Sequence, residues 1–163
     1  MTRRLILIRH AKSGWDDPMA DDHERVLTRR GEKAAIAIGR WLQRMGYVPD
    51  RILSSDATRT RQTAAHISLG LDPAPPLTFA PALYHAAPDT IFDLVQSETG
   101  STAVIGHNPG IAMLAHGLVR ARPKHDRFSD YPTCATTVID FADAIVPGTG
   151  HCIDFIVPRD LTD

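Results

Sequence analysis

The chain has 163 residues, of which 43% are hydrophobic and 23% are charged. This composition is typical of a soluble globular domain with a substantial core, and it excludes a disordered or fibrous chain. The formal net charge is −1, so no overall positive field favours nucleic acid or an anionic membrane, and any recognition of anions must be local. We therefore expect one domain over residues 1–163 with neither a nucleic-acid nor a membrane partner. The sequence indicates no oligomeric state.

The N-terminal segment predicts a short strand. Residues 5–8 are consecutively apolar, as in a strand buried on both faces, and the run stops at Arg9 and His10. Four apolar residues after Arg3-Arg4 are fewer than the about 7 to 15 of a signal-peptide core, so we expect a cytoplasmic protein. No stretch approaches the about 18 apolar residues that a membrane span requires.

Helix and strand patterns alternate along the next part of the chain. The Asp-rich segment 16–24 predicts an irregular loop over the end of the first strand. Thr28 is a candidate N-cap of an amphipathic helix that Gly46 ends in a left-handed conformation. Residues 51–53 then predict a strand, and the turn and capping residues 54–56 lead into a helix over about 57–69.

The second half continues the same order. The patterns predict a strand at 77–79, a helix over about 88–97, a strand at 102–105, a helix over about 111–119, and an antiparallel pair of strands at 133–141 and 151–157. This succession favours an α/β fold: a three-layer sandwich with a mainly parallel central sheet and helices on both faces.

Cysteine and histidine spacings give no sign of a metal site. Cys134 and Cys152 lie in strand-like segments without CxxC or ligand spacing, so we expect buried thiols. The eight histidines show no HExxH-like pattern. We therefore expect neither a metal ion nor a cofactor.

Charged and imidazole side chains follow three of the predicted strands. Arg9 and His10 end the first strand, Arg59 lies in the first turn of the helix after the second, and His107 stands on a glycine-flanked turn after the strand at 102–105. In open α/β sheets such strand ends meet at one crevice. A neutral imidazole can attack phosphorus, while arginines and free helix N–H groups bind the phosphoryl oxygens. These residues predict a phosphate-transfer site that needs no metal.

Four segments in this order resemble the histidine phosphatase superfamily. Residues 9–11 (RHA) resemble its RHG signature, residues 54–63 (SSDATRTRQT) its SSPxxRxxQT block, and residues 104–109 (VIGHNP) its GHNP block. Residues 25–28 (RVLT), with Gly31 after them, are similar to the RPLTxxG stretch of the SixA-like phosphohistidine phosphatase branch. The resemblance spans about residues 5–115.

The resemblance implies a phosphoglycerate mutase-like fold and a hydrolase that works through a phosphohistidine intermediate. It implies His10 as the nucleophile, Arg9 and Arg59 as phosphate-binding cations, and His107 as the histidine that stabilises the transferring phosphoryl group. Asp16 stands where mutase-like members often carry a pocket asparagine, so the resemblance makes it a candidate substrate-binding residue that positions water or phosphate.

Three neighbours of these residues, Lys12, Ser13 and Asn108, are further candidates for substrate binding, although ordinary loop polarity explains them equally well. The basic segment 121–127 is interpreted as solvated surface, with the attraction of an acidic phosphoprotein as the alternative.

The sequence departs from the family pattern at two places. Ala11 replaces the signature glycine, which is tolerable if its φ is negative. Members that cleave sugar phosphates carry a glutamate acid after the third strand, whereas residues 79–85 read FAPALYH. Protonation of an alkoxide leaving group contributes about 10²–10⁴-fold, and phosphohistidine needs less help. We therefore expect a phosphohistidine-bearing protein as substrate, with His85 or Asp16 as alternative acids.

Two alternatives remain open at this point. The substrate could be a small phosphomonoester or phosphoanhydride. The chain could also be a non-catalytic phosphate-binding module, which the joint presence of all four central residues disfavours and which would release no phosphate.

Overall fold

The computed structural model describes residues 2–15 and 17–161. Within these residues, a six-stranded sheet of order β3-β2-β4-β1-β5-β6 forms the centre of the molecule. β1 pairs in parallel with β4, and β2 in parallel with both β4 and β3, whereas β5 is antiparallel to β1 and β6. The strands are β1 (Arg3–Arg9), β2 (Arg51–Ser54), β3 (Leu77–Phe79), β4 (Ser101–Gly106), β5 (Thr136–Phe141) and β6 (His151–Ile156). The mainly parallel sheet and the antiparallel terminal pair are confirmed.

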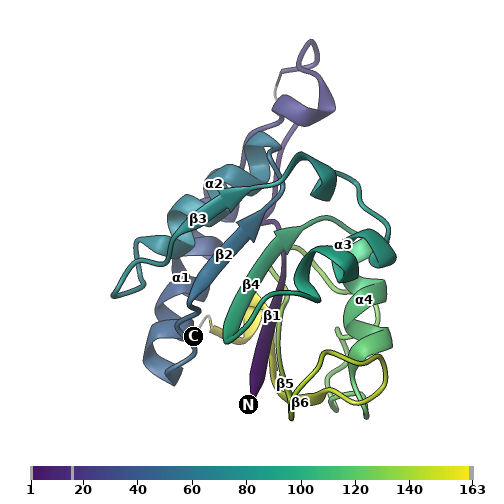
Figure 1. Ribbon diagram of the computed structural model, residues 1–163. Coiled ribbons are helices and arrows are strands. Elements are labelled where there is room, and N and C mark those ends of the chain that lie inside the picture. Colours follow the sequence, from purple (N-terminus) through teal and green to yellow (C-terminus); the bar gives the residue numbers. More distant parts are fainter. Residues whose placement is uncertain (1, 16, 162–163) are drawn as a thin grey trace.

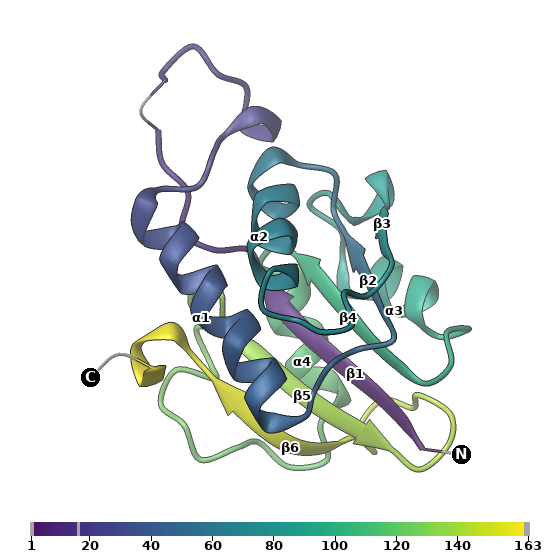
Figure 2. The same ribbon diagram turned by 90° about the vertical axis from the view of Figure 1, so that its left-hand side faces the viewer.

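Helices cover both faces of this sheet (Figures 1 and 2). Two of them, α1 and α2, contribute to a core cluster on one face, and α3 and α4 contribute to a cluster on the other. The helices are α1 (Arg29–Met45), α2 (Thr58–Ser68), α3 (Pro88–Val95) and α4 (Gly110–Leu118), with short 3-10 turns η1 (Asp22–Glu24), η2 (Pro81–Leu83) and η3 (Pro158–Leu161). The three-layer α/β sandwich is thereby confirmed. Every helix in the described part of the chain is too short or too polar to serve as a transmembrane span.

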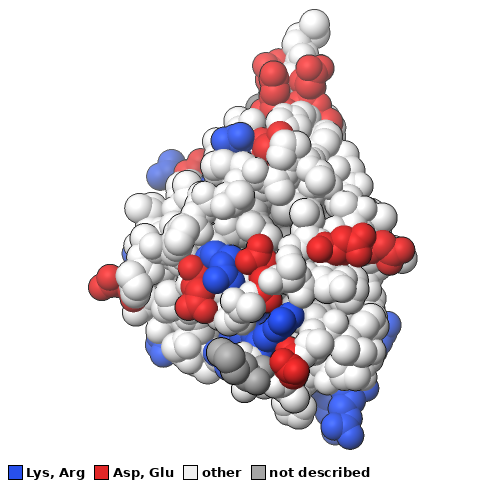
Figure 3. All heavy atoms as spheres, viewed as in Figure 1, with Lys and Arg blue, Asp and Glu red and all other residues white. Residues whose placement is uncertain are grey.

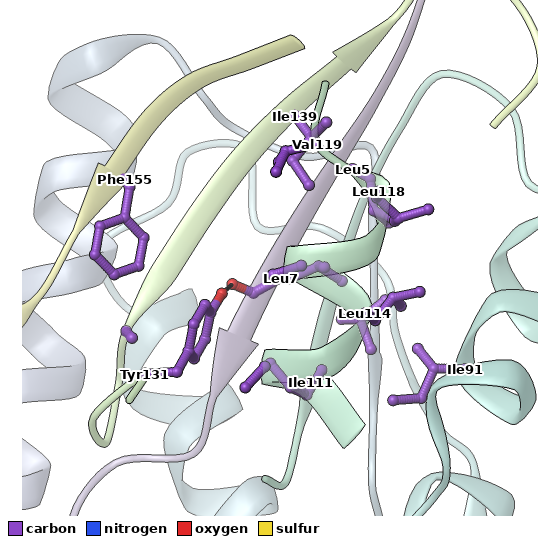
Figure 4. Packing of buried hydrophobic residues seen from close by; sticks show 14 of the residues in the cluster. Leu5, Leu7, Ile91, Ile111, Leu114, Leu118, Val119, Tyr131, Ile139 and Phe155 are labelled. Atoms are coloured by element: carbon purple, nitrogen blue, oxygen red, sulfur yellow. Dashed lines mark hydrogen bonds between the residues drawn. The ribbon is translucent and has the colours of Figure 1, made fainter. Parts of the chain in front are cut away.

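The central strand β1 belongs to both cores. Leu5 and Leu7 pack on the α3–α4 side, whereas Ile6 and Ile8 pack on the α1–α2 side, and all four are fully buried. Figure 4 shows Leu7 beside Tyr131, whose hydroxyl donates a 2.8 Å hydrogen bond to the Leu7 carbonyl. Burial on both faces explains why this strand is apolar at successive positions instead of alternating.

The helix α1 begins and ends at the cap residues that its own sequence predicts. The Thr28 hydroxyl accepts a 3.0 Å hydrogen bond from the Gly31 N–H, and Gly46 ends the helix at φ 76°. Both predicted caps are confirmed. At α2 the N-cap residue is Ala57, which has no side-chain cap; its N–H instead donates to the Ser55 hydroxyl at 3.3 Å.

Both cysteines are free thiols, as expected, but only Cys134 is buried as predicted, whereas Cys152 is half-buried. Cys152 lies in β6, but the placement of Cys134 in a strand was wrong. Cys134 precedes β5 and has a left-handed backbone with φ 62°, because its N–H donates to the His10 carbonyl at 2.9 Å rather than joining a strand ladder.

A loop over residues 13–27, which we call the protruding loop, stands out from the carboxyl-terminal edge of the parallel strands (Figure 1). An antiparallel bridge between Ser13 and Leu27 closes its base. The exposed Asp17 and Asp21 belong to this loop, and acidic side chains gather at its far end (Figure 3). The irregular loop expected here is present, with η1 as its one short regular turn among the described residues.

Candidate active site

The site forms where the sheet changes its direction of winding. β1 and β4 are neighbours, but β1 leads to α1 on one face and β4 to α4 on the other. A crevice is expected beyond the carboxyl ends of two such strands. His10 follows β1 and His107 follows β4, and the centroids of their rings lie 5.3 Å apart.

A cavity of about 340 Å³ surrounds these two rings. Every site residue predicted from the sequence lines it, except Asp16, which lies outside the described residues. The lining consists of Arg9, His10, Lys12, Ser13, Asp22, Arg25, Arg59, His85, His107, Asn108 and Thr133.

The hydrogen bonding of His10 fixes which ring nitrogen is available. Its Nδ1 lies 2.7 Å from the Ala11 carbonyl oxygen, which can only accept, so Nδ1 carries the proton of the neutral ring. Nε2 is then the atom with a free electron pair. Burial, together with the nearby Arg9 and Arg59, lowers the pKa of His10 to about 4. Ala11 is not among the described residues with positive φ, which meets the condition for replacing glycine.

His107 lies deeper in the same cavity. Its Nε2 is 2.8 Å from the Ser55 hydroxyl, and its buried Nδ1 has no hydrogen-bond partner among the described residues. Burial first, and then the proximity of His10 and Arg59, lower the pKa of His107 to about 3. Both imidazoles are therefore neutral near pH 7, as attack by nitrogen on an electrophile requires.

We expect both rings to remain neutral at pH 5.5, where a histidine with the ordinary pKa of about 6.5 is mostly protonated. Because the folded-state values lie below that of the unfolded chain, the unfolded chain takes up protons first as pH falls. The free energy of unfolding should consequently decrease from pH 6.5 toward pH 4. The nitrogen chemical shifts of the two rings at pH 5.5 measure their protonation. Urea unfolding at pH 7.5 and 5.5 measures the change in the free energy of unfolding. Titration of both rings near pH 6.5 would contradict it.

Two arginines that line the cavity, the half-buried Arg9 and the buried Arg59, supply positive charge beside the rings. Arg9 donates from Nη1 to the Tyr131 carbonyl at 3.2 Å, and the Asn108 amide donates to the same oxygen at 2.9 Å. Arg59 stands in the first turn of α2 and is 2% exposed. The Nε atoms of both arginines are buried without a partner among the described residues. Such donors around a cavity favour an anion.

A carboxylate that the sequence analysis did not single out also lies in the cavity. The backbone carbonyl of Asp22 accepts from Arg59 Nη1 at 2.6 Å, and its Oδ2 accepts from Arg59 Nη2 at 3.0 Å. The same Oδ2 lies 2.5 Å from the Tyr84 hydroxyl and 2.9 Å from His85 Nε2, and Oδ1 accepts from Arg25 at 3.0 Å. Burial opposes ionisation, but these hydrogen bonds outweigh it and hold the pKa of Asp22 far below its usual range.

His85 lies beside this carboxylate on the rim of the cavity. Its backbone has φ 51°, a left-handed conformation that is uncommon for a residue with a side chain. Its ring centroid is 5.0 Å from that of His107 and 4.1 Å from that of Tyr84. The loop that carries it sits against the start of α4, where a Cβ on Gly110 would lie 2.0 Å from the Ala86 carbonyl oxygen. The missing side chain of Gly110 therefore leaves room for this neighbouring loop.

Comparison with known proteins agrees with this geometry. Residues 5–85 match the model of the histidine phosphatase superfamily (branch 1). An uncharacterized protein of Mycobacterium tuberculosis is 35% identical over 93% of this chain and 100% of its own length. The chain belongs to the histidine phosphatase superfamily.

Other similar proteins indicate the branch of the superfamily to which this histidine phosphatase belongs. An uncharacterized chloroplastic protein of Arabidopsis thaliana is 47% identical over 72 residues, which cover 44% of this chain and only 33% of that protein. A structure from Agrobacterium tumefaciens, described as a SixA phosphohistidine phosphatase, superposes with a TM-score of 0.81 at 28% identity, over 96% of this chain and 98% of that one. The SixA-like assignment is confirmed.

Two further structures bear on the fold alone. A SixA protein histidine phosphatase complexed with tungstate has a TM-score of 0.81 at 21% identity, covering 98% of this chain and 99% of that one. A phosphoglycerate mutase from Plasmodium falciparum has a TM-score of 0.62 at 21% identity, covering 96% and 89%. The phosphoglycerate mutase-like fold is confirmed.

Four cavity or rim residues of this histidine phosphatase received no role from sequence reasoning: Asp22, Arg25, Tyr84 and Thr133. Arg25 begins the RVLT block, so the motif itself carried a signal, and Asp22 stands three residues before it. Nothing in the local pattern distinguished Asp22 from the neighbouring Asp21. Tyr84 lies in the segment that lacks the family glutamate, and its neutral hydroxyl does not belong to the acid pattern of that segment.

Proposed function

We propose that this phosphatase forms a phosphoenzyme on Nε2 of His10, without a metal ion, and that its substrate is phosphohistidine in a protein. The observation that carries the proposal is the hydrogen bond from His10 Nδ1 to the Ala11 carbonyl, which leaves Nε2 unprotonated inside a cavity lined by arginines. The binding of tungstate, a tetrahedral oxyanion, by a protein of the same fold supports a phosphate-sized ligand here.

The proposed reaction has two displacements. Nε2 of His10 attacks phosphorus, and the bond between phosphorus and the substrate nitrogen breaks, while Arg9 and Arg59 hold the phosphoryl oxygens. Because the other ring nitrogen of phosphohistidine can carry a proton, the leaving group departs as neutral imidazole without an external acid. Water then attacks phosphorus, the bond to His10 breaks, and phosphate leaves with the ring restored.

The residues around the leaving-group side support an activated substrate. The glutamate of sugar-phosphate members is missing from residues 79–85, and Asp22 stays ionised because its pKa is held so low, so Asp22 cannot donate a proton. His85 is the remaining candidate acid among the described residues, and its rim position suits a large leaving group that approaches from solvent. Phosphohistidine, whose departure needs little protonation, fits such a site best.

A substrate panel tests this proposal. We expect kcat/KM for a phosphohistidine peptide to exceed that for a sugar phosphate by at least about a hundredfold, the lower bound of a missing general acid. Rapid quenching with the labelled peptide should trap an acid-labile, alkali-stable phosphoenzyme. Equal rates on both substrates would favour a small phosphomonoester, and bound but unreleased phosphate would favour a non-catalytic module.

A further inference from the structure

The active-site cavity continues into a depression on the side of the molecule formed by the start of α1 and by η3. A second cavity, of about 230 Å³, shares Lys12 and Thr133 with the active-site cavity. A third, of about 550 Å³, shares Arg30 and Pro158 with the second. We call the second and third cavities together the basic groove. Because each cavity shares lining residues with the next, the groove leads directly away from His10.

The charge of the groove is entirely positive among the described residues that line it. These include five cations and no carboxylate, although the chain as a whole has a net charge of −1. The five cations are Lys12, Arg30, Lys33, Arg127 and Arg159. An excess of this kind creates a local field that attracts anions and is screened by salt.

Most of this charge is available to a ligand. Lys12, Arg30 and Lys33 are exposed, and within the described part of the chain their side chains have no hydrogen bond or ion pair. Arg127 pairs with Asp130 at 2.9 Å, but that carboxylate is outside the groove lining. Three unpaired cations in a row from the active-site mouth outward suit a ligand that carries several negative charges.

Apolar surface lies between the cations. Ala34 and Ala37 of α1 line one wall of the groove, and Pro158 of η3 lines the other, with Pro132 and Val157 nearer the active site. A free phosphate ion would gain nothing from such surface. A polypeptide, in contrast, presents carboxylates and apolar side chains together and is long enough to extend beyond the active-site cavity.

We propose that the basic groove binds an acidic polypeptide segment next to the phosphorylated residue of a protein substrate. This inference rests on the proposed function, since it assumes that the phosphoryl group enters the cavity of His10 while the flanking chain lies along α1. It names the partner by its chemistry: a protein whose phosphorylated residue is followed or preceded by several Asp or Glu residues.

The test compares two charge-reversal variants of the same helix. Arg30→Glu with Lys33→Glu changes the groove, whereas Arg40→Glu with Arg44→Glu makes the same charge change at exposed positions of α1 outside the groove. Each variant is assayed on an acidic phosphohistidine peptide, a neutral one and a small aryl phosphate. Affinity for the unphosphorylated acidic peptide, measured by fluorescence anisotropy, gives a readout that needs no catalysis.

We expect the groove variant to lose at least about tenfold in both kcat/KM and affinity for the acidic peptide, and to keep its rate on the aryl phosphate. The control variant should lose much less, and salt should remove the wild-type preference for the acidic peptide. Equal losses in both variants, or an unchanged affinity in the groove variant, would overturn the proposal. Stronger competition by a single-stranded oligonucleotide than by the peptide would assign the groove to nucleic acid instead. If neither phosphohistidine peptide is hydrolysed but the acidic peptide binds as expected, the proposed function fails, and only the binding of an acidic segment in the groove stands.

Discussion

Replacing His10 with alanine should lower phosphate release by at least about a thousandfold, the scale expected for loss of a covalent nucleophile. The hydrogen bond on Nδ1 of His10 defines the free electron pair on its Nε2, and a pKa of about 4 leaves the ring neutral at pH 7. Steady-state release of phosphate from a phosphohistidine peptide measures the loss. Rapid-quench labelling should find no phosphoenzyme in this variant.

The matched control for this change is His151→Ala. His151 is exposed at the start of β6 and lies outside the cavity, so its removal should leave the rate within about twofold of wild type. Circular dichroism and the melting temperature show whether the His10 variant is still folded. A folded His10→Ala protein that still acquires label would place the nucleophile elsewhere.

Replacing Asp22 with asparagine should strengthen the inhibition by inorganic phosphate or vanadate by about tenfold. In the structure the Asp22 carboxylate already pairs with Arg59, with its Oδ2 3.0 Å from Nη2. A phosphate group that binds Arg59 must therefore share the guanidinium with this carboxylate or displace it. Two unit charges about 5 Å apart repel by about 3 kcal/mol at an effective dielectric constant of about 20. The Asp22 side chain is 37% exposed, so solvent screens part of this repulsion. If about 1.4 kcal/mol of binding free energy is recovered when the charge is removed, phosphate binds about tenfold more tightly.

The inhibition constant of phosphate against an aryl phosphate substrate measures the effect of Asp22→Asn. Asp21→Asn is the control, because Asp21 is exposed, precedes Asp22 in the same loop and lies outside the cavity lining. That variant should bind phosphate as wild type does. Weaker inhibition in Asp22→Asn would mean that the carboxylate orients Arg59 for phosphate rather than competing with it.

Local patterns in the sequence were enough to locate the two histidines. Each follows an uninterrupted apolar strand, and a polar residue directly after a buried strand must lie at the edge of the sheet. The caps of α1 were predictable for the same reason, since Thr28 and Gly46 act on their own helix. Arg59 could be placed in the first turn of α2 because the turn and capping residues 54–56 mark where that helix begins.

The role of Asp22 in the cavity could not be predicted, because its partners Arg59 and Tyr84 are 37 and 62 residues away along the chain. The same holds for Gly110, where the Ala86 carbonyl oxygen of another loop leaves no room for a side chain. The strand-like pattern around Cys134 was misleading because the chain there turns to pair with His10 instead. Contacts between segments that meet only after folding carry no periodic signal.

The two walls of the cavity are attached to the molecule in different ways. Arg9 ends and His10 directly follows a strand that packs in both hydrophobic cores, so we expect their backbone to be among the last parts of the chain to open. Asp22 is carried by a loop whose Trp15 and Met19 are exposed, and Asp22 contacts the cavity through hydrogen bonds with Arg59. We therefore expect the cavity to open more readily at the wall that carries Asp22 than at the wall that carries His10.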